Sequence, residues 1–205
     1  MRDLKLDHLA VSAASRDSAR AHVEEALGVS MQPGGAHERF ATHNHLLGLA
    51  DGLYLEAISI DPDAPVPAHP RWFDLDNFSG PPRLSNWICA VTDLTSALAD
   101  WPEAGDAVAL ERGALQWQMA VPPSGALPFD GLFPPLIQWQ GDLHPAAMLE
   151  PSNLRLKALT LRLPQAQALK ARLGIIEGAV LRFEMAQAPE LIAEFDTPHG
   201  LRVLT

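Results

Sequence analysis

Residues 34–62 read GGAHERFATHNHLLGLADGLYLEAISIDP, and their pattern predicts three short antiparallel strands. Asp51-Gly52 is a strong hairpin signal between two apolar runs. We expect the strands at 36–41, 43–50 and 53–60. The last run places the carboxylate of Glu56 among apolar neighbours, where an unpaired charge is costly. This stretch therefore predicts a sheet with a polar group in its interior.

The same order of elements recurs along the chain. A strand at 4–13 and a helix at 15–27, capped by Ser15 and ended by Gly28, precede the three strands. This order predicts an α+β fold in which repeated βαβββ modules form a cupped mixed β-sheet with helices on the outer face. The expected divisions are a first module at 1–62, a Pro-rich connector at 63–82, a second module at 83–150 and a third, C-terminal unit at 151–205. In the later units we expect strands at 83–91, 107–111, 115–121, 133–140, 154–163, 179–186, 190–196 and 201–205, and helices from about 93 and after Pro164.

The composition argues against several classes of partner. The chain has 205 residues and a formal net charge of −10, with 15 Lys and Arg against 25 Asp and Glu. Without a basic patch, neither nucleic acid nor an anionic membrane is an expected partner. Cys89 is the single cysteine, which excludes an intrachain disulfide. The start, MRDLKLDHLAV, has no apolar signal core, so we expect a cytoplasmic protein. No phosphate-binding glycine loop or dinucleotide fingerprint is present, so no nucleotide cofactor is expected.

Three short motifs follow one another in the first module: Gly34-Gly35-Ala36-His37, Thr42-His43-Asn44 and Tyr54-Leu55-Glu56. With these motifs the chain resembles the vicinal oxygen chelate (VOC) superfamily, and within it the glyoxalase-like branch. The likeness continues into residues 135–139, His144-Pro145 and 197–200.

The resemblance implies a site for a divalent metal. In that superfamily the first and fourth strands of each module supply the ligands, which are His8 and Glu56 in the first module. In the second module the corresponding positions are Asn86 and, within 137–140, Gln138 or Gln140. Neutral amides are weak ligands for Fe, Zn, Mn or Ni, so a third strong ligand would have to come from His37 or His45.

Each candidate residue has a structural alternative. Glu56 is a catalytic base or a metal ligand, or it forms a salt bridge; His8, on one strand face with Leu6 and Ala10, is a ligand or base, or a histidine buried in a sheet. His37 is a second catalytic candidate, or a surface-loop histidine. Four further residues are expected to bind substrate, although tryptophans more often line a core: Asn44, Tyr54, Asn86 and Trp139.

The resemblance implies a glyoxalase-like protein that acts on a small organic molecule in the sheet cup. Metal-assisted lyase, isomerase and dioxygenase chemistry are all open. The alternative is a metal-free protein of the bleomycin-resistance type that binds and sequesters a small molecule. The unit from 154 to 205 could instead form a homodimer surface.

Overall fold

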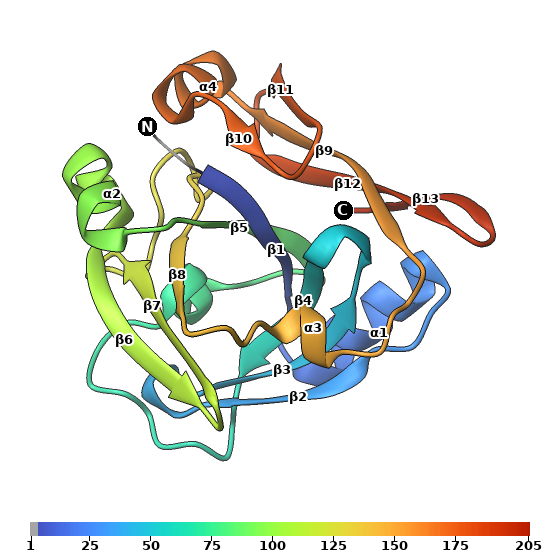
Figure 1. The fold of residues 1–205 in the computed structure, drawn as a ribbon, viewed down its shortest axis with the longest axis horizontal. Helices are drawn as coiled ribbons and strands as arrows, with labels where there is room; N and C mark the ends of the chain where they lie inside the picture. The colour runs from blue at the N-terminus through green and yellow to red at the C-terminus, as the bar shows by residue number, and fades with distance from the viewer. Residues whose placement is uncertain (1–3) are drawn as a thin grey trace.

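The computed structural model describes residues 4–205, and a strongly curved nine-stranded sheet forms its centre (Figure 1). The strand order is β2-β3-β4-β1-β5-β8-β7-β6, with β10 beside β1. β1 and β5 are antiparallel, whereas β1 is parallel to β4 and β5 is parallel to β8. The expected cupped mixed sheet is thus confirmed. The strands are β1 Leu4–Ser12, β2 Gln32–His37, β3 Thr42–Gly48, β4 Tyr54–Ile60, β5 Arg83–Ala90, β6 Asp106–Arg112, β7 Leu115–Val121, β8 Leu136–Gln140 and β10 Ile176–Glu177.

Helices α1 and α2 begin at the capping residues that the local sequence predicts. In α1, Arg16–Leu27, the Ser15 side chain accepts a hydrogen bond from the backbone of Ser18, and Gly28 ends the helix at φ 72°. Asp93 caps α2, Leu94–Asp100. No helix within residues 4–205 has the length and apolar character needed to cross a membrane. The remaining helical segments are α3 Pro145–Met148, α4 Ala166–Leu173 and the 3-10 turns η1 Glu38–Phe40, η2 Ala50–Gly52, η3 Trp72–Asn77 and η4 Pro102–Ala104.

Two predicted strands differ from the structure. The strand expected at 36–41 ends at His37, because residues 38–40 turn into η1 and Ala41 adopts a left-handed φ of 49°. The strand expected at 133–140 starts only at Leu136, because two prolines precede it and cannot donate hydrogen bonds in a sheet. The first strand therefore lies four residues earlier than expected, at Gln32–His37, whereas the second is shortened only at its start.

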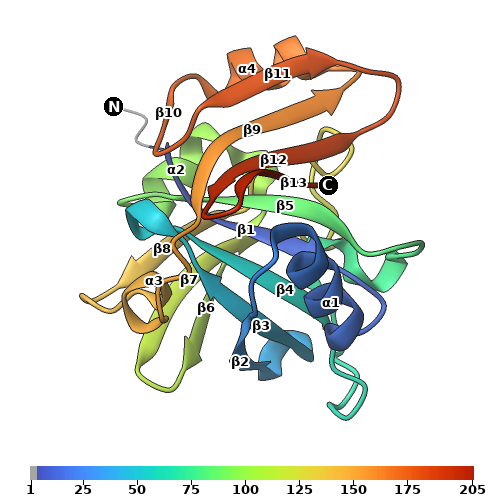
Figure 2. The same ribbon diagram turned by 90° about the vertical axis from the view of Figure 1, so that its right-hand side faces the viewer.

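A second sheet covers the convex side of the first, as Figure 2 shows. Its strand order is β11-β9-β12-β13. Apolar side chains of both sheets and of α1 share one core, for example Leu9, Leu161 and Phe195. The C-terminal unit thus buries the outer face of the large sheet. The strands of the second sheet are β9 Arg155–Leu163, β11 Leu181–Met185, β12 Glu190–Thr197 and β13 Gly200–Leu204.

A smaller core lies on the concave side of the large sheet. There η3, in the Pro-rich connector, buries Trp72 and Leu75 against Phe40 and Trp117. The connector therefore packs into the cup. The polar residues discussed below lie beside this smaller core.

Candidate active site

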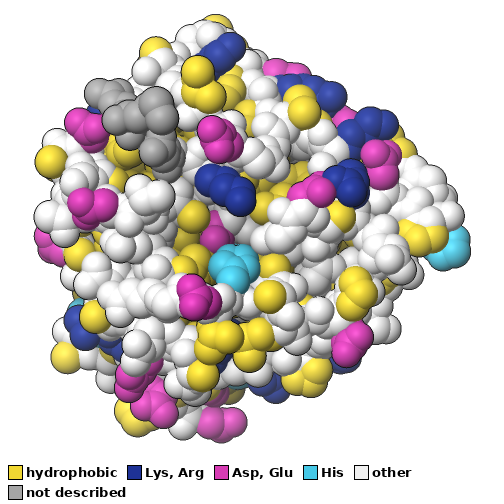
Figure 3. Space-filling model, in the orientation of Figure 1, with side chains coloured by type: hydrophobic (Ala, Val, Ile, Leu, Met, Phe, Trp, Pro, Cys, Tyr) yellow, Lys and Arg dark blue, Asp and Glu magenta, His cyan; other side chains and the backbone are white. Residues whose placement is uncertain are grey.

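A narrow cavity opens on the concave face and is lined by both halves of the large sheet and by the connector. Its free space of about 30 Å³ holds roughly two water molecules, so a larger ligand can bind only if lining side chains move. Figure 3 shows a hollow near the centre of one face, with acidic and hydrophobic side chains behind a histidine. The cavity is lined by His8, His37, Asn44, Leu46, Tyr54, Glu56, Trp72, Phe73, Arg112, Trp117, Met119, Ile137 and Trp139.

A bulge in β1 turns two consecutive side chains toward the concave side. Leu6 is opposite Cys89 and His8 is opposite Ile88, so Asp7 is the extra residue between them. Leu6 packs into the convex core, whereas His8 lines the cavity. The expectation that His8 shares a strand face with Leu6 is therefore wrong, because the bulge shifts the alternation by one residue. His8 does share the concave side with Ala10.

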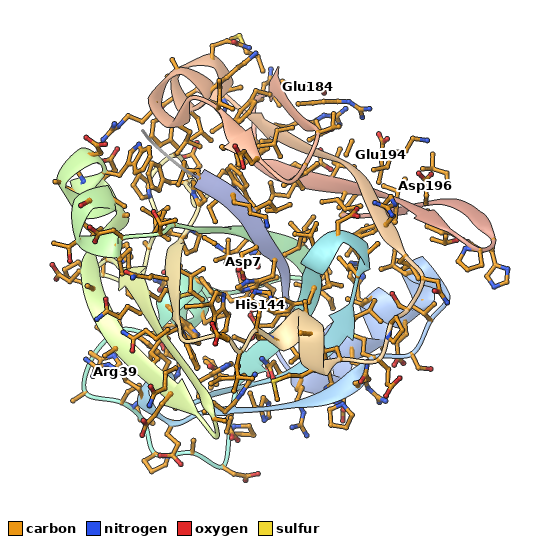
Figure 4. All side chains as sticks on the ribbon, viewed as in Figure 1. Asp7, Arg39, His144, Glu184, Glu194 and Asp196 are labelled. Atoms are coloured by element: carbon orange, nitrogen blue, oxygen red, sulfur yellow. The ribbon has the colours of Figure 1, made fainter. Side chains whose placement is uncertain are left out.

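The buried carboxylate of Asp7 receives three hydrogen bonds. His8 donates to it from Nδ1 at 2.6 Å, and Trp139 and His144 each donate at 3.0 Å. Asp7 and His144 lie together near the centre of Figure 4. Burial alone would raise the pKa of Asp7, but the hydrogen bonds from His144 and His8 hold that pKa well below its usual range. Asp7 is therefore ionised, and its contact with Nδ1 leaves Nε2 of His8 facing the cavity.

Glu56 lies beside His8 on the neighbouring strand β4, with Oε2 at 3.9 Å from Nε2. Asn44 donates from Nδ2 to Oε1 of Glu56 at 2.5 Å. The orientation of that amide is set by the backbone, because Gly35 donates its N–H to Oδ1 of Asn44 at 2.8 Å. The carboxylate of Glu56 is therefore held by a donor on one oxygen, while its other oxygen faces His8.

His37 occupies the next position along the cavity wall. Its Nε2 is 4.0 Å from Oε1 of Glu56 and accepts a hydrogen bond from Nη1 of Arg112 at 3.3 Å. Its Nδ1 donates to Oγ1 of Thr42 at 3.1 Å. Burial, together with the nearby charge of Arg112, lowers the pKa of His37 to about 4 although Glu56 acts in the opposite direction. His37 is therefore neutral near pH 7.

The two glycines before His37 make room for side chains of the site. A Cβ atom on Gly34 would lie 1.9 Å from Oδ1 of Asn44, and one on Gly35 would lie 2.7 Å from Cδ of Arg112. Any larger residue at either position would have to displace these groups. The absence of side chains at Gly34 and Gly35 thus leaves space beside β2 for the side chains of Asn44 and Arg112.

Aromatic rings close the cavity. Tyr54 stacks on His8 with ring centroids 4.3 Å apart and an angle of 14° between the planes. Burial raises the pKa of Tyr54 well above its usual value, and the charges of Asp7 and Glu56 add to this effect. Trp139 lines the cavity and also donates to Asp7, so it orients polar groups as well as forming a wall.

The structure brings together His8, His37, Asn44, Tyr54, Glu56 and Trp139, but it places Asn86 elsewhere. Asn86 is opposite Ala10 in β5 and lines a separate depression beside η3. The residue opposite His8 in β5 is Ile88, and the role expected for Asn86 stays a prediction. Gln138 accepts a hydrogen bond from the backbone of Leu94, and Gln140 is exposed. The described residues that line the cavity include neither glutamine, nor do they include His45.

Within residues 4–205, no group of three His, Cys, Asp or Glu side chains has an arrangement that could hold a metal ion. His8 and Glu56 present Nε2 and a carboxylate to the same space, but the Nε2 lone pair of His37 is engaged by Arg112. The second half of the sheet contributes Met119 and Ile137 on its side, which are not ligands for Fe, Zn, Mn or Ni. The donor set is therefore incomplete for a tightly held divalent metal.

Sequence reasoning missed Asp7, Arg112 and His144. The bulge that turns Asp7 inward cannot be recognised from the alternation of side chains that is expected along a strand. Arg112 ends a strand on the opposite edge of the sheet and enters the site only because β2 and β6 come together. His144 stands before Pro145, which is typical of a turn; it does cap α3, but it also holds Asp7.

Comparison with known proteins gives a family match over most of the chain. A family model described as a glyoxalase-like domain matches residues 6–175. No curated protein gives a significant sequence match.

Solved structures share the fold at low sequence identity. A hypothetical protein from Staphylococcus aureus is 14% identical, with a TM-score of 0.59 over 91% of this chain and 88% of that chain. Methylmalonyl-CoA epimerase from Mycobacterium tuberculosis is 18% identical, with a TM-score of 0.43 over 68% of this chain and 89% of that chain. A variant of the epimerase from Streptomyces coelicolor, in complex with 2-nitronate-propionyl-CoA, is 13% identical, with a TM-score of 0.44 over 67% of this chain and 98% of that chain.

Proposed function

The chain belongs to the glyoxalase-like domain family of the VOC superfamily, and from this premise we propose that it is an enzyme that transfers a proton at a carbon next to a carbonyl group of a small organic molecule. The observation that carries this proposal is the facing pair of buried groups, Oε2 of Glu56 and Nε2 of His8, at 3.9 Å. A carboxylate and an imidazole on the neighbouring strands β4 and β1 can both reach one substrate held above them. The reaction class is that of an isomerase or a lyase.

In the proposed mechanism Glu56 is the base. Its Oε2 accepts the proton from the substrate carbon, and the electron pair of the broken C–H bond moves into the carbonyl group to form an enolate. His8, when protonated on Nε2, donates that proton to the enolate oxygen or returns one to the carbon. Asp7 keeps the ring of His8 in place through Nδ1, as carboxylates commonly do for catalytic histidines. Asn44 holds Glu56, and Tyr54 supports His8 by stacking.

His37 has a different role in this proposal from the catalytic one expected from the sequence. Its Nδ1–H donates a hydrogen bond to Thr42, and its Nε2 accepts one from Arg112, so neither ring nitrogen can exchange a proton with a substrate. We assign it to orienting Arg112 and to separating that cation from Glu56.

Members of this superfamily often use a divalent metal. His8 and Glu56 are the residues of this cavity that could take part in binding one, and it would polarise a substrate oxygen. Because the donor set among residues 4–205 is incomplete, no step of the mechanism is assigned to a metal.

The second candidate function is binding without turnover. It is favoured by the apolar wall that the second half of the sheet contributes, which includes Trp117, Met119 and Ile137. Such a wall can hold a small molecule by burial of apolar surface alone.

Exchange of carbon-bound hydrogen for deuterium separates these candidates. Small carbonyl compounds, including pyruvate, pyruvamide and dihydroxyacetone, would be incubated in D₂O with the protein and followed by proton NMR. We expect exchange with wild-type protein, loss of about 10²-fold or more in Glu56→Gln and His8→Asn, and no change in the exposed controls Glu38→Gln and His199→Asn. Activity that survives EDTA would support the metal-free mechanism. A protein that binds these compounds but exchanges none of their hydrogens would be a binding protein, and the proposal would be wrong.

A further inference from the structure

We infer that Arg112 selects substrates that carry a carboxylate, so that the substrate class is a small oxo acid. This inference rests on the proposed function for the position of the reacting carbon. It concerns a residue of the second half of the sheet that faces the acid–base pair of the first half.

Arg112 reaches the cavity from the opposite edge of the sheet. It is the last residue of β6, and its side chain passes over Gly35, where the missing Cβ leaves space for it. Its Nη1 lies 3.3 Å from Nε2 of His37, which is itself 4.0 Å from Glu56. The ring of His37 thus separates the cation from the proposed base. A small molecule with a negative group and a carbon acid could bridge the two.

The guanidinium has no carboxylate partner among residues 4–205. Other arginines, such as Arg71, Arg155 and Arg172, are paired with Asp or Glu, whereas within the described chain Arg112 has a hydrogen bond to His37 alone. His37 is neutral and cannot balance the charge. A guanidinium carries five donors in a planar fork that matches a carboxylate. Most of these donors are available to a ligand.

The position of Arg112 also fits the entrance of the site. Arg112, His37 and Trp117 line both the cavity and an outer groove between η1 and β6. Arg39 lines the outer groove but not the cavity, and Figure 4 shows it far from Asp7 and His144. A ligand entering through this groove would meet Arg112 before it reached Glu56. Because Glu56 and Asp7 repel anions, Arg112 is the group, among the described residues that line the cavity, that can hold the negative end there.

The experiment compares pyruvate with its uncharged amide, pyruvamide, by isothermal titration calorimetry. Both compounds have similar size and shape, so their difference reports the charge. We expect pyruvate to bind at least about tenfold more tightly to the wild type, and Arg112→Gln to lose about tenfold or more of the pyruvate affinity while binding of pyruvamide stays nearly constant. Arg112→Lys should be intermediate, and Arg39→Gln should match the wild type. Circular dichroism would check that each variant is folded.

Three results would overturn the inference: equal affinity for both compounds, an unchanged pyruvate affinity in Arg112→Gln, or no binding of pyruvate to the wild type. The titrations would be repeated in Glu56→Gln, in which the proposed base is removed. Charge-dependent binding without hydrogen exchange would leave the role of Arg112 intact and refute the proposed reaction. Hydrogen exchange without a preference for pyruvate over pyruvamide would support the proposed reaction and refute the role of Arg112.

Discussion

Replacing Gly34 by alanine should destabilise the protein through Asn44, because the new Cβ would lie 1.9 Å from its Oδ1. The backbone of Gly34 is outside the left-handed region, so strain in φ does not contribute. Displacing Asn44 breaks its hydrogen bonds with Gly35 and with Glu56. A neutral hydrogen bond contributes about 1 kcal/mol and one to a charged group about 1.5–3 kcal/mol. The expected loss in the free energy of unfolding is therefore about 2.5–4 kcal/mol.

The double variant Gly34→Ala/Asn44→Ala tests this reasoning. Asn44→Ala removes the same two hydrogen bonds and should cost a similar amount alone. In its background the Cβ added by Gly34→Ala no longer meets the Asn44 side chain and meets only the backbone oxygen of residue 44, at 2.9 Å, so the second change should cost less than it does in the wild type. Urea denaturation followed by tryptophan fluorescence would give the three values. If the double variant lost the sum of the two single losses to within about 0.5 kcal/mol, the coupling between Gly34 and Asn44 would be refuted.

Two further predictions concern the titrating groups. Because burial lowers the pKa of His37 to about 4, the unfolded chain takes up a proton below pH 6.5 that the native state does not, and the free energy of unfolding should fall by about 2 kcal/mol as the pH drops from 7 to 5. His37→Gln should reduce this pH dependence of stability, and the exposed control His199→Gln should not. Equal pH dependence in all three proteins would contradict the assignment. Asp7→Asn should lower kcat for hydrogen exchange by about 10²-fold and alter the pH profile of kcat with little effect on KM, because the change misorients His8. Trp139→Phe removes one of the three hydrogen-bond donors to Asp7 and should have a smaller effect. Equal losses of kcat in the two variants would indicate a purely structural role for Asp7.

The cupped sheet could be predicted because its signals are local. Alternating apolar residues, the Asp51-Gly52 turn and the caps Ser15 and Gly28 each act over a few residues. The approach of His8 to Glu56 follows from the parallel pairing of β1 with β4, where Ala10 is beside Glu56. Both expectations needed only the order of the elements.

The rest of the site depends on irregular or distant contacts. The bulge at Asp7 shifts the register of β1 against β5, and no residue type in 6–8 is a sequence signal for a bulge. The same kind of shift, between Ala10 and Val11, adds Ser85 to β5 next to Asn86. Arg112 meets His37 across 75 positions of the chain through the meeting of two sheet edges. Such closure depends on the curvature of the whole sheet, which pattern reasoning does not supply.

The adjacency of Asp7 and His8 has a consequence for how this scaffold can change. Because Asp7 and His8 are neighbours in one strand, a single peptide segment carries both, and their relative positions do not depend on the packing of distant elements. The other polar groups of the site are different, since Glu56, Asn44 and Arg112 come from three other strands. Each of these can be exchanged by a point mutation while the histidine and its carboxylate stay together. The Asp7–His8 pair can therefore stay unchanged while substitutions on three other strands alter the groups around it.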